Sequence, residues 1–156
     1  MKKYVVLLCI LWLGFIFYNS SKTGVESNAK SFTITNMLRA EVRKERGESS
    51  MKYTPLPSNA KEESFNLFIR KNAHAFEYCV LAILACGVLF SLNLKGKNAV
   101  IYILFICLLY AVLDEFHQIY VPGRTSSVRD VLIDFAGSIL GMLAFYFTYY
   151  KILRKK

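Results

Sequence analysis

The sequence of 156 residues lacks most of the short motifs that identify an enzyme or a metal protein. It has no Cys-x-x-Cys pair, no serine nucleophile elbow, no Walker loop and no His-Glu-x-x-His helix. No local motif therefore assigns a metal, a nucleotide or a catalytic serine. Its four cysteines are too few for a secreted disulfide scaffold. Apolar residues, in contrast, make up 54% of the chain, which excludes an intrinsically disordered protein.

The apolar residues are concentrated in four uncharged blocks of 18, 17, 16 and 16 residues, at 4–21, 78–94, 98–113 and 135–150. A membrane-spanning helix needs about 20 apolar residues, whereas helices of soluble proteins average about 11–12. Blocks longer than that average, and apolar on every face, predict an all-α integral membrane bundle of four transmembrane helices. The predicted spans are about 4–21, 73–94, 98–119 and 131–150, in a single domain over residues 1–156.

The first block has the two preceding lysines of a signal peptide. Its bulky side chains, and the lack of an Ala-x-Ala-like site after it, favour a retained membrane anchor. All four cysteines lie within the apolar blocks, where they act as small hydrophobic residues.

Basic residues predict the orientation of the bundle. The short segments that flank the blocks on one side contain eight cations and no acidic residue: Lys2, Lys3, Lys95, Lys97, Lys151, Arg154, Lys155 and Lys156. The positive-inside rule makes this side cytoplasmic, so both termini are expected in the cytoplasm and the protein in the cell membrane. The net charge of +9 thus reflects topology and not nucleic-acid binding.

The long segment 22–71 is expected on the outer side. Residues 25–47 mix apolar and charged side chains, which predicts a helix lying against the membrane. Residues 48–58 contain two prolines and indicate a linker. Asn59, with Glu62 three residues later, predicts the cap of a helix that continues into the second span.

Polar and ionisable residues gather at the outer ends of the second, third and fourth spans. Each of these helices reaches membrane length only by including its polar turn, which predicts a polar pocket in the outer leaflet. Ionisable residues at membrane depth are functional candidates. The candidates for catalysis are His74, Glu77, Asp114 and Asp134, and those for substrate binding are Ser21, Arg70, Lys71, Glu115, Gln118, Arg124 and Asp130.

Helical spacing supports convergence of these side chains. Arg70, His74 and Glu77 are separated by four and three residues, so they share one face of a helix. In the fourth span, Gly137 and Gly141 form a small-xxx-small pair that allows another helix to approach closely.

Three motifs lie at the outer helix ends, namely Arg70-Lys71-x-x-His74-x-x-x-Tyr78, Asp114-Glu115-x-x-Gln118-x-x-x-Pro122-Gly123-Arg124 and Asp130-x-x-x-Asp134-x-x-Gly137-x-x-x-Gly141. These motifs resemble those of the VanZ-like family. Residues 20–31 also resemble the Ser-rich segment that follows the first span in that family. The resemblance covers nearly the whole chain. It implies an integral membrane protein associated with glycopeptide resistance, chiefly to teicoplanin.

Three interpretations of the pocket stay open. An enzyme would exchange protons between His74 and a carboxylate, while the cations hold an anionic head group. That head group would belong to a lipid-linked cell-wall intermediate or to a lipid-tailed glycopeptide. A non-catalytic module would pair the same residues with lipid head groups or with a partner protein. A metal site is the third interpretation, and a salt-bridged network is favoured over it.

Membrane lipids are the expected partners, no cofactor and no nucleic acid are predicted, and a homodimer stays open. A transporter is disfavoured because the polar groups do not continue across the membrane.

Overall fold

The structure, a computed structural model, describes residues 2–47, 57 and 59–153, and this part of the chain contains helices but no strand. The elements are α1 (Lys2–Ser20), α2 (Gly24–Glu45), α3 (Ala60–Ser91), α4 (Lys97–Gln118), α5 (Val128–Thr148) and the π-helical turn η1 (Tyr149–Leu153). The predicted all-α class is confirmed. The linker predicted at 48–58 lies, apart from Pro57, outside the described residues.

Four helices are long and apolar enough to cross a membrane, namely α1, α3, α4 and α5 with the start of η1. Within the most apolar 18-residue stretch of each of these helices, only a minority of the residues are buried inside the protein. The buried share is 11% in α1 and at most 33% in the other three. Most apolar side chains therefore face outward, where hydrocarbon solvates them. The protein is a multi-pass membrane protein.

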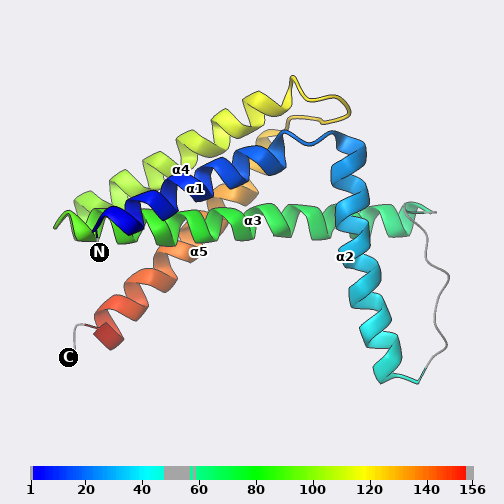
Figure 1. Ribbon diagram of the computed structural model, residues 1–156, viewed down its shortest axis with the longest axis horizontal. Coiled ribbons are helices and arrows are strands. Elements are labelled where there is room, and N and C mark those ends of the chain that lie inside the picture. Colours follow the sequence, from blue (N-terminus) through cyan, green and yellow to red (C-terminus); the bar gives the residue numbers. More distant parts are fainter. Residues whose placement is uncertain (1, 48–56, 58, 154–156) are drawn as a thin grey trace.

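Helix α3 is the longest element and the centre of the bundle. Its 32 residues make it about 48 Å long at 1.5 Å per residue, whereas the hydrocarbon core of a bilayer is about 30 Å thick. It begins at the cap predicted from the sequence, where the side chain of Asn59 accepts a hydrogen bond from the backbone N–H of Glu62. Figure 1 shows that the N-terminal part of α3 extends beyond α1, α4 and α5.

Helices α3 and α5 pack with their backbones in contact. A Cβ atom built at Gly137 would collide with the carbonyl of Ala75, and one at Gly141 would collide with the carbonyl of Cys79. Ala75 and Cys79 are four residues apart on α3, so the two glycines of α5 match one face of that helix. The close helix approach predicted from the glycine pair is confirmed, and α3 packs most extensively against α5.

The core between the helices combines two large aromatic residues, Tyr78 and Phe90, with small and medium apolar ones. Tyr78 is fully buried beside Leu81 and meets Ile103 and Cys107 of α4 and Ile16 of α1 in one cluster. All four cysteines are free thiols, as expected of cysteines that serve as apolar residues.

Helix α1 is attached by a few directional hydrogen bonds in addition to packing. The indole N–H of Trp12 donates to the carbonyl oxygen of Glu77 at 2.9 Å. The hydroxyl of Tyr110 donates to the carbonyl oxygen of Leu13 at 2.6 Å. These bonds fix the rotation of a helix that buries little apolar surface.

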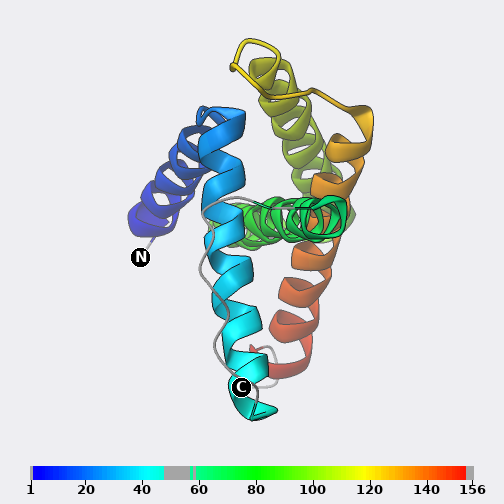
Figure 2. The same ribbon diagram turned by 90° about the vertical axis from the view of Figure 1, so that its right-hand side faces the viewer.

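Helix α2 crosses α3 at a steep angle, as Figures 1 and 2 both show. Thr23 and Glu26 form a capping box at its start, in which each side chain bonds to the other residue's backbone N–H. On the face toward α3, Phe32 is buried and Asn66 donates from Nδ2 to the carbonyl oxygen of Asn28 at 3.2 Å. The helix predicted at 25–47 therefore exists and runs across the direction of the spans, while its contact with the membrane stays a prediction.

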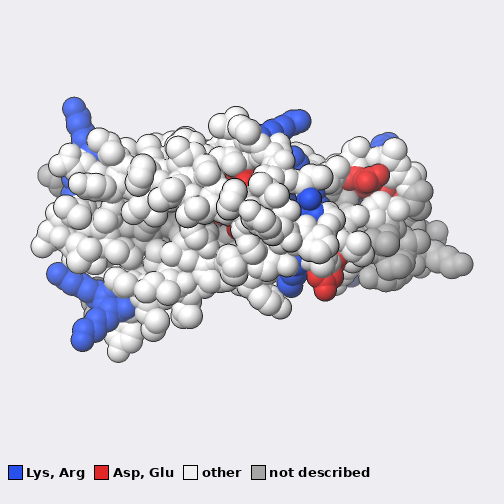
Figure 3. All heavy atoms as spheres, turned by 90° about the horizontal axis from the view of Figure 1, so that it is seen from above, with Lys and Arg blue, Asp and Glu red and all other residues white. Residues whose placement is uncertain are grey.

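Charged side chains lie toward the two ends of the molecule, and a wide band between them shows almost none on the face seen in Figure 3. At one end, here called the basic end, lie Lys2, Lys3, Lys95, Lys97 and Lys151. At the other, here called the polar end, cations and carboxylates are mixed. The basic residues at 154–156 that contributed to the predicted orientation lie outside the described residues.

Candidate functional site

Two loops dock on each other at the polar end, the α1–α2 loop at 21–23 and the α4–α5 loop at 119–127. The backbone N–H of Gly24 donates to the carbonyl oxygen of Pro122 at 3.0 Å. A Cβ atom at Gly24 would collide with the carbonyl of Gly123, which adopts a φ of 72°. The Pro-Gly turn therefore fits against a position that only glycine can occupy without displacement.

Arg124 connects this turn to the end of α1. Its Nε donates to the carbonyl oxygen of Lys22 at 3.1 Å, and Nη2 donates to that of Asn19 at 3.2 Å. Asn19 lies in the last turn of α1 and Lys22 just after it, where backbone acceptors need partners. Burial lowers the pKa of the Arg124 guanidinium below its ordinary value, and the positive charge of Arg70 lowers it further. Two guanidinium groups thus lie close enough to repel each other.

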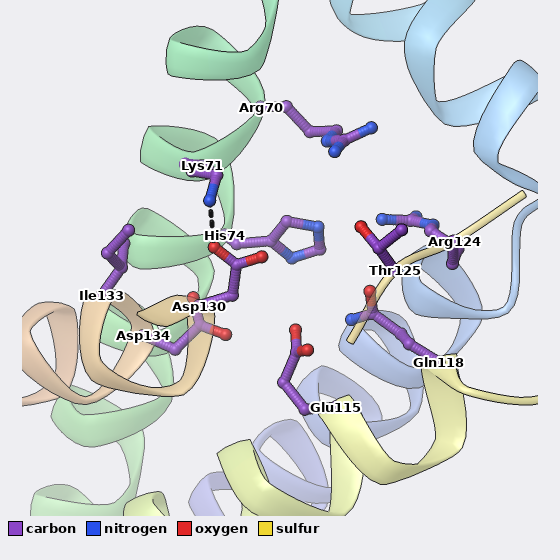
Figure 4. A pocket seen from close by; sticks show the side chains of 10 residues that line it. All are labelled: Arg70, Lys71, His74, Glu115, Gln118, Arg124, Thr125, Asp130, Ile133 and Asp134. Atoms are coloured by element: carbon purple, nitrogen blue, oxygen red, sulfur yellow. Dashed lines mark hydrogen bonds and ion pairs between the residues drawn. The ribbon is translucent and has the colours of Figure 1, made fainter. Parts of the chain in front are cut away.

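A first cavity lies among α3, α4, α5 and the α4–α5 loop, and we call it the charge-balanced cavity. Its lining side chains are Arg70, Lys71, His74, Glu115, Gln118, Arg124, Thr125, Asp130, Ile133 and Asp134. Three cations face three carboxylates. Figure 4 shows the guanidinium groups of Arg70 and Arg124 on one side of the His74 ring and the three carboxylates on the other. Its volume of about 20 Å³ is enough for about one water molecule.

Several charges of this cavity already have partners within the protein. Lys71 of α3 forms an ion pair with Asp130 of α5. The carboxylate of Glu115 accepts a hydrogen bond from the backbone N–H of Ser127 at 2.8 Å. Asp134 is only 3% exposed and extends from α5 toward the same cavity (Figure 4). Helices α3, α4 and α5 are thus joined by polar contacts at this end.

A second cavity lies among α1, α2 and α3 and shares three residues with the first. Its lining residues are Phe15, Asn19, Lys22, Ser27, Lys30, Ser31, Ile34, Arg70, Ala73, His74, Glu77 and Arg124. Four of these are Lys or Arg and one is Glu, so we call it the basic cavity. Its volume of about 170 Å³ is several times that of the first.

His74 lies on the wall between the two cavities and lines both. Its Nδ1 is 3.3 Å from Oε2 of Glu77, one turn further along α3, within ion-pair distance but not aligned for a hydrogen bond. The other oxygen of that carboxylate, Oε1, accepts a hydrogen bond from Nδ2 of Asn19 at 2.8 Å. An imidazole beside a carboxylate that is itself held in place can accept and release a proton.

Asp114 holds α1 to α4 and lines neither cavity. Its Oδ2 accepts hydrogen bonds from the hydroxyl of Ser20 at 2.7 Å and from Nε2 of Gln118 at 3.1 Å. Oδ1 is buried without a hydrogen-bond partner in the part of the chain that the structure describes. Among the four candidates for catalysis, His74 lines both cavities, Asp134 only the first and Glu77 only the second.

Six of the seven candidates for substrate binding line the first cavity. The exception is Ser21, which is exposed. Its hydroxyl donates to the carbonyl oxygen of Phe17 at 2.8 Å and lies 3.2 Å from Nε2 of His117. The neighbouring Ser20, which was not among the candidates, is fully buried and takes the contact with Asp114.

The sequence reasoning missed the residues of α1 and α2 that line the basic cavity. Asn19, Lys22, Ser27, Lys30 and Ser31 all belong to it. A signal was present in the sequence, because Ser27 and Ser31 lie four residues apart in the segment that resembles the Ser-rich stretch of the VanZ-like family. The steep crossing of α2, which brings this face to the site, could not be derived from helical spacing.

No group of three or more His, Cys, Asp or Glu side chains is arranged to hold a metal ion within the described residues. The carboxylates of the polar end instead contact cations, hydroxyl groups and backbone N–H groups.

The fold and site define an integral membrane protein of four spanning helices with a polar site enclosed at one end of the bundle. Residues 5–150 match the family model described as VanZ/LLP1, so nearly the whole chain is covered and the protein belongs to the VanZ/LLP1 family. Neither a curated protein nor a solved structure matches the chain.

Proposed function

We propose that this VanZ/LLP1 protein binds an anionic head group at the outer face of the cell membrane and thereby contributes to resistance to glycopeptides such as teicoplanin. The observation that supports this most directly is the convergence of all four spans, α2 and both loops on two adjoining cavities at one end of the bundle. Such a site lies where a molecule anchored in the bilayer presents its head group. Family membership supports the resistance role.

The orientation is part of the proposal. Five described lysines lie at the end opposite the site, and lysine-rich short segments favour the cytoplasmic side. Both termini are then cytoplasmic and the two cavities open outward. A reporter fused to the C-terminus should be active only in the cytoplasm, and an active periplasmic or extracellular reporter would contradict this orientation.

Acid–base chemistry on the bound head group is a second candidate function. The observation that favours it is the position of His74 on the wall between the two cavities. Its Nδ1 lies beside the carboxylate of Glu77, and Asn19 donates a hydrogen bond to that carboxylate. A non-catalytic module would use the same cations and would show no residue whose loss abolishes function. The two candidates differ in what they do to the lipid, since only an enzyme changes its chemical composition.

The test compares glycopeptide resistance and envelope lipids in cells that carry the wild-type protein or His74→Ala. Arg129→Ala is the control, because this residue is exposed at the polar end and lines neither cavity. Immunoblots of membrane fractions establish equal protein levels. Loss of resistance in His74→Ala alone supports the site. A change in lipid composition with the wild type that His74→Ala abolishes favours the enzyme, and equal resistance in all strains contradicts the proposal.

A further inference from the structure

We propose that the basic cavity among α1, α2 and α3 is a binding site for the phosphate group of a lipid, in which the Arg70 guanidinium is the principal ligand of the phosphate oxygens. This inference rests on the proposed function and names the chemical class of the head group. It also places that group in the second cavity and not in the charge-balanced one.

The charges favour the basic cavity for an anion. Lys22, Lys30, Arg70 and Arg124 line it, whereas Glu77 is its one carboxylate. The charge-balanced cavity contains three carboxylates against three cations, and Lys71 is already paired within it. An anion that enters the first cavity would meet as much repulsion as attraction.

Arg70 is available to a ligand. In the part of the chain that the structure describes, its side chain forms no hydrogen bond and no ion pair, although it lines both cavities. Its charged neighbour Arg124 uses Nε and Nη2 for backbone carbonyls. Two like charges beside each other at the membrane interface are unfavourable until an anion lies between or beside them. A phosphate would relieve this repulsion, and guanidinium binds phosphate oxygens with two parallel hydrogen bonds.

The basic cavity is also the larger of the two, as a phosphate ligand requires. A volume of about 20 Å³ holds about one water molecule, so the charge-balanced cavity has no space for a tetrahedral phosphate. The basic cavity, at about 170 Å³, has space for several atoms. On the α2 side, the hydroxyl group of Ser27 and the ammonium group of Lys30 provide further donors.

The apolar part of the lining indicates a lipid as the source of the phosphate. Phe15 and Ile34 line the basic cavity, and each is 43% exposed. Phe15 lies five residues before the end of α1, which is about 7.5 Å deeper along the helix. The cavity therefore has cations toward the polar end and the aromatic side chain of Phe15 deeper along α1, the order in which a phospholipid presents its head group and chains.

The experiment measures binding to the purified full-length protein in detergent at fixed ionic strength, by isothermal titration calorimetry. The probes are dihexanoyl phosphatidic acid, dihexanoyl phosphatidylcholine and inorganic phosphate. The variants are Arg70→Gln, Arg70→Lys and, as a matched control, Arg129→Gln, which removes one positive charge at the same end of the protein outside both cavities. Thermal unfolding of each variant shows whether it is folded.

We expect phosphatidic acid to bind the wild type and Arg129→Gln alike, and Arg70→Gln about tenfold to a hundredfold more weakly, as for the loss of hydrogen bonds to a charged group. Arg70→Lys should restore part of the affinity, because a point charge replaces the two parallel hydrogen bonds. Phosphatidic acid binding more tightly than inorganic phosphate identifies a lipid as the source. Equal, Arg70-dependent binding of inorganic phosphate supports the site with a free anion as its ligand.

Equal affinity of Arg70→Gln and the wild type for phosphatidic acid, with Arg70→Gln folded, would overturn the inference. If Arg70→Gln does not fold, an Arg70→Lys variant that binds phosphatidic acid as tightly as the wild type would overturn the inference instead, because the two parallel hydrogen bonds would then contribute nothing. The proposed function fails separately, when His74→Ala leaves glycopeptide resistance unchanged. Arg70-dependent phosphate binding without any effect on resistance would therefore keep this site and reject its assigned role.

Discussion

The hydroxyl of Ser20, the last residue of α1, donates to Oδ2 of Asp114 near the end of α4 at a distance of 2.7 Å. Both residues are buried, Ser20 completely. This bond joins the first span to the third at the level of the site. Because neither group has access to water, the bond contributes more than a surface contact would.

The first prediction concerns this bond. Ser20→Ala should destabilise the protein by about 1–3 kcal/mol, because the substitution leaves a buried carboxylate with one donor fewer. Ser21→Ala is the matched control, since Ser21 is exposed and bonds to its own helix, and it should change stability by less than about 0.5 kcal/mol. Thermal unfolding in detergent measures both. Equal melting temperatures for the two variants would mean that the Ser20–Asp114 bond contributes nothing to stability.

The second prediction concerns the contact between α3 and α5. Gly137→Ala places a methyl group against the carbonyl of Ala75 and should cost about 1–3 kcal/mol through displacement of the two backbones. Gly14→Ala on α1 has no neighbouring atom within 4 Å of the new Cβ, so no loss is expected. Size-exclusion profiles and melting temperatures compare the two. A Gly14→Ala protein as unstable as Gly137→Ala would show that glycine is required for some other reason.

A third prediction concerns the docking of the two loops. Gly24→Ala should lower the melting temperature, because the new Cβ atom would occupy the position of the Gly123 carbonyl. It should also weaken binding at the basic cavity, since Arg124 is held by the same loop contact. Val25→Ala changes the next residue, which is 68% exposed, and serves as the control. If both variants melt at the wild-type temperature, the loops are not held together by this contact.

The fourth prediction is a dependence on pH at the start of α2. Hydrogen bonds from Thr23 lower the pKa of Glu26 below its ordinary value of 4.5. A carboxyl group whose pKa is lower in the folded state contributes stability above its unfolded pKa and loses it as the pH falls through the folded value. Amide hydrogen exchange in the first turn of α2 should therefore accelerate below about pH 4.5 relative to the intrinsic rate.

Glu26→Gln provides the control for this effect. Glutamine preserves a capping box without a titratable group, so protection of the same amides should no longer change between pH 6 and pH 3. Persistence of the pH dependence in Glu26→Gln would assign it to another group.

Much of this fold follows from the sequence for one physical reason. The requirement that a spanning helix satisfies its own backbone makes long apolar blocks almost unambiguous, and the four spans could be assigned on that ground. The same reasoning found the cap at Asn59 and the close approach at Gly137, because both depend on neighbours in one helix or on the size of one residue. It also placed His74 and Asp134 at one end of the bundle.

What the sequence could not provide is the division of the polar end into two cavities. That division depends on how α2 crosses α3 and on which face of α1 turns inward, and neither is set by periodicity within a helix. The choice between Ser20 and Ser21 is an example, because adjacent residues differ by about 100° around a helix and only packing decides which one is buried. The sequence also grouped Asp114 with the cavity residues. In the structure it lines neither cavity and accepts hydrogen bonds from Ser20 and Gln118.

Helix α1 differs from the other spans in the way it is held. Lipid replaces the apolar contacts of a departing helix at little cost, so the free energy that retains α1 resides mainly in a few directional bonds, from Trp12, Tyr110, Asn19 and Ser20. All four bonds involve residues in the half of α1 nearest the site, namely Trp12, Leu13, Asn19 and Ser20. We therefore expect α1 to be the span that separates first when the bundle comes apart, and its departure to uncover the basic cavity to the bilayer while α3, α4 and α5 stay assembled.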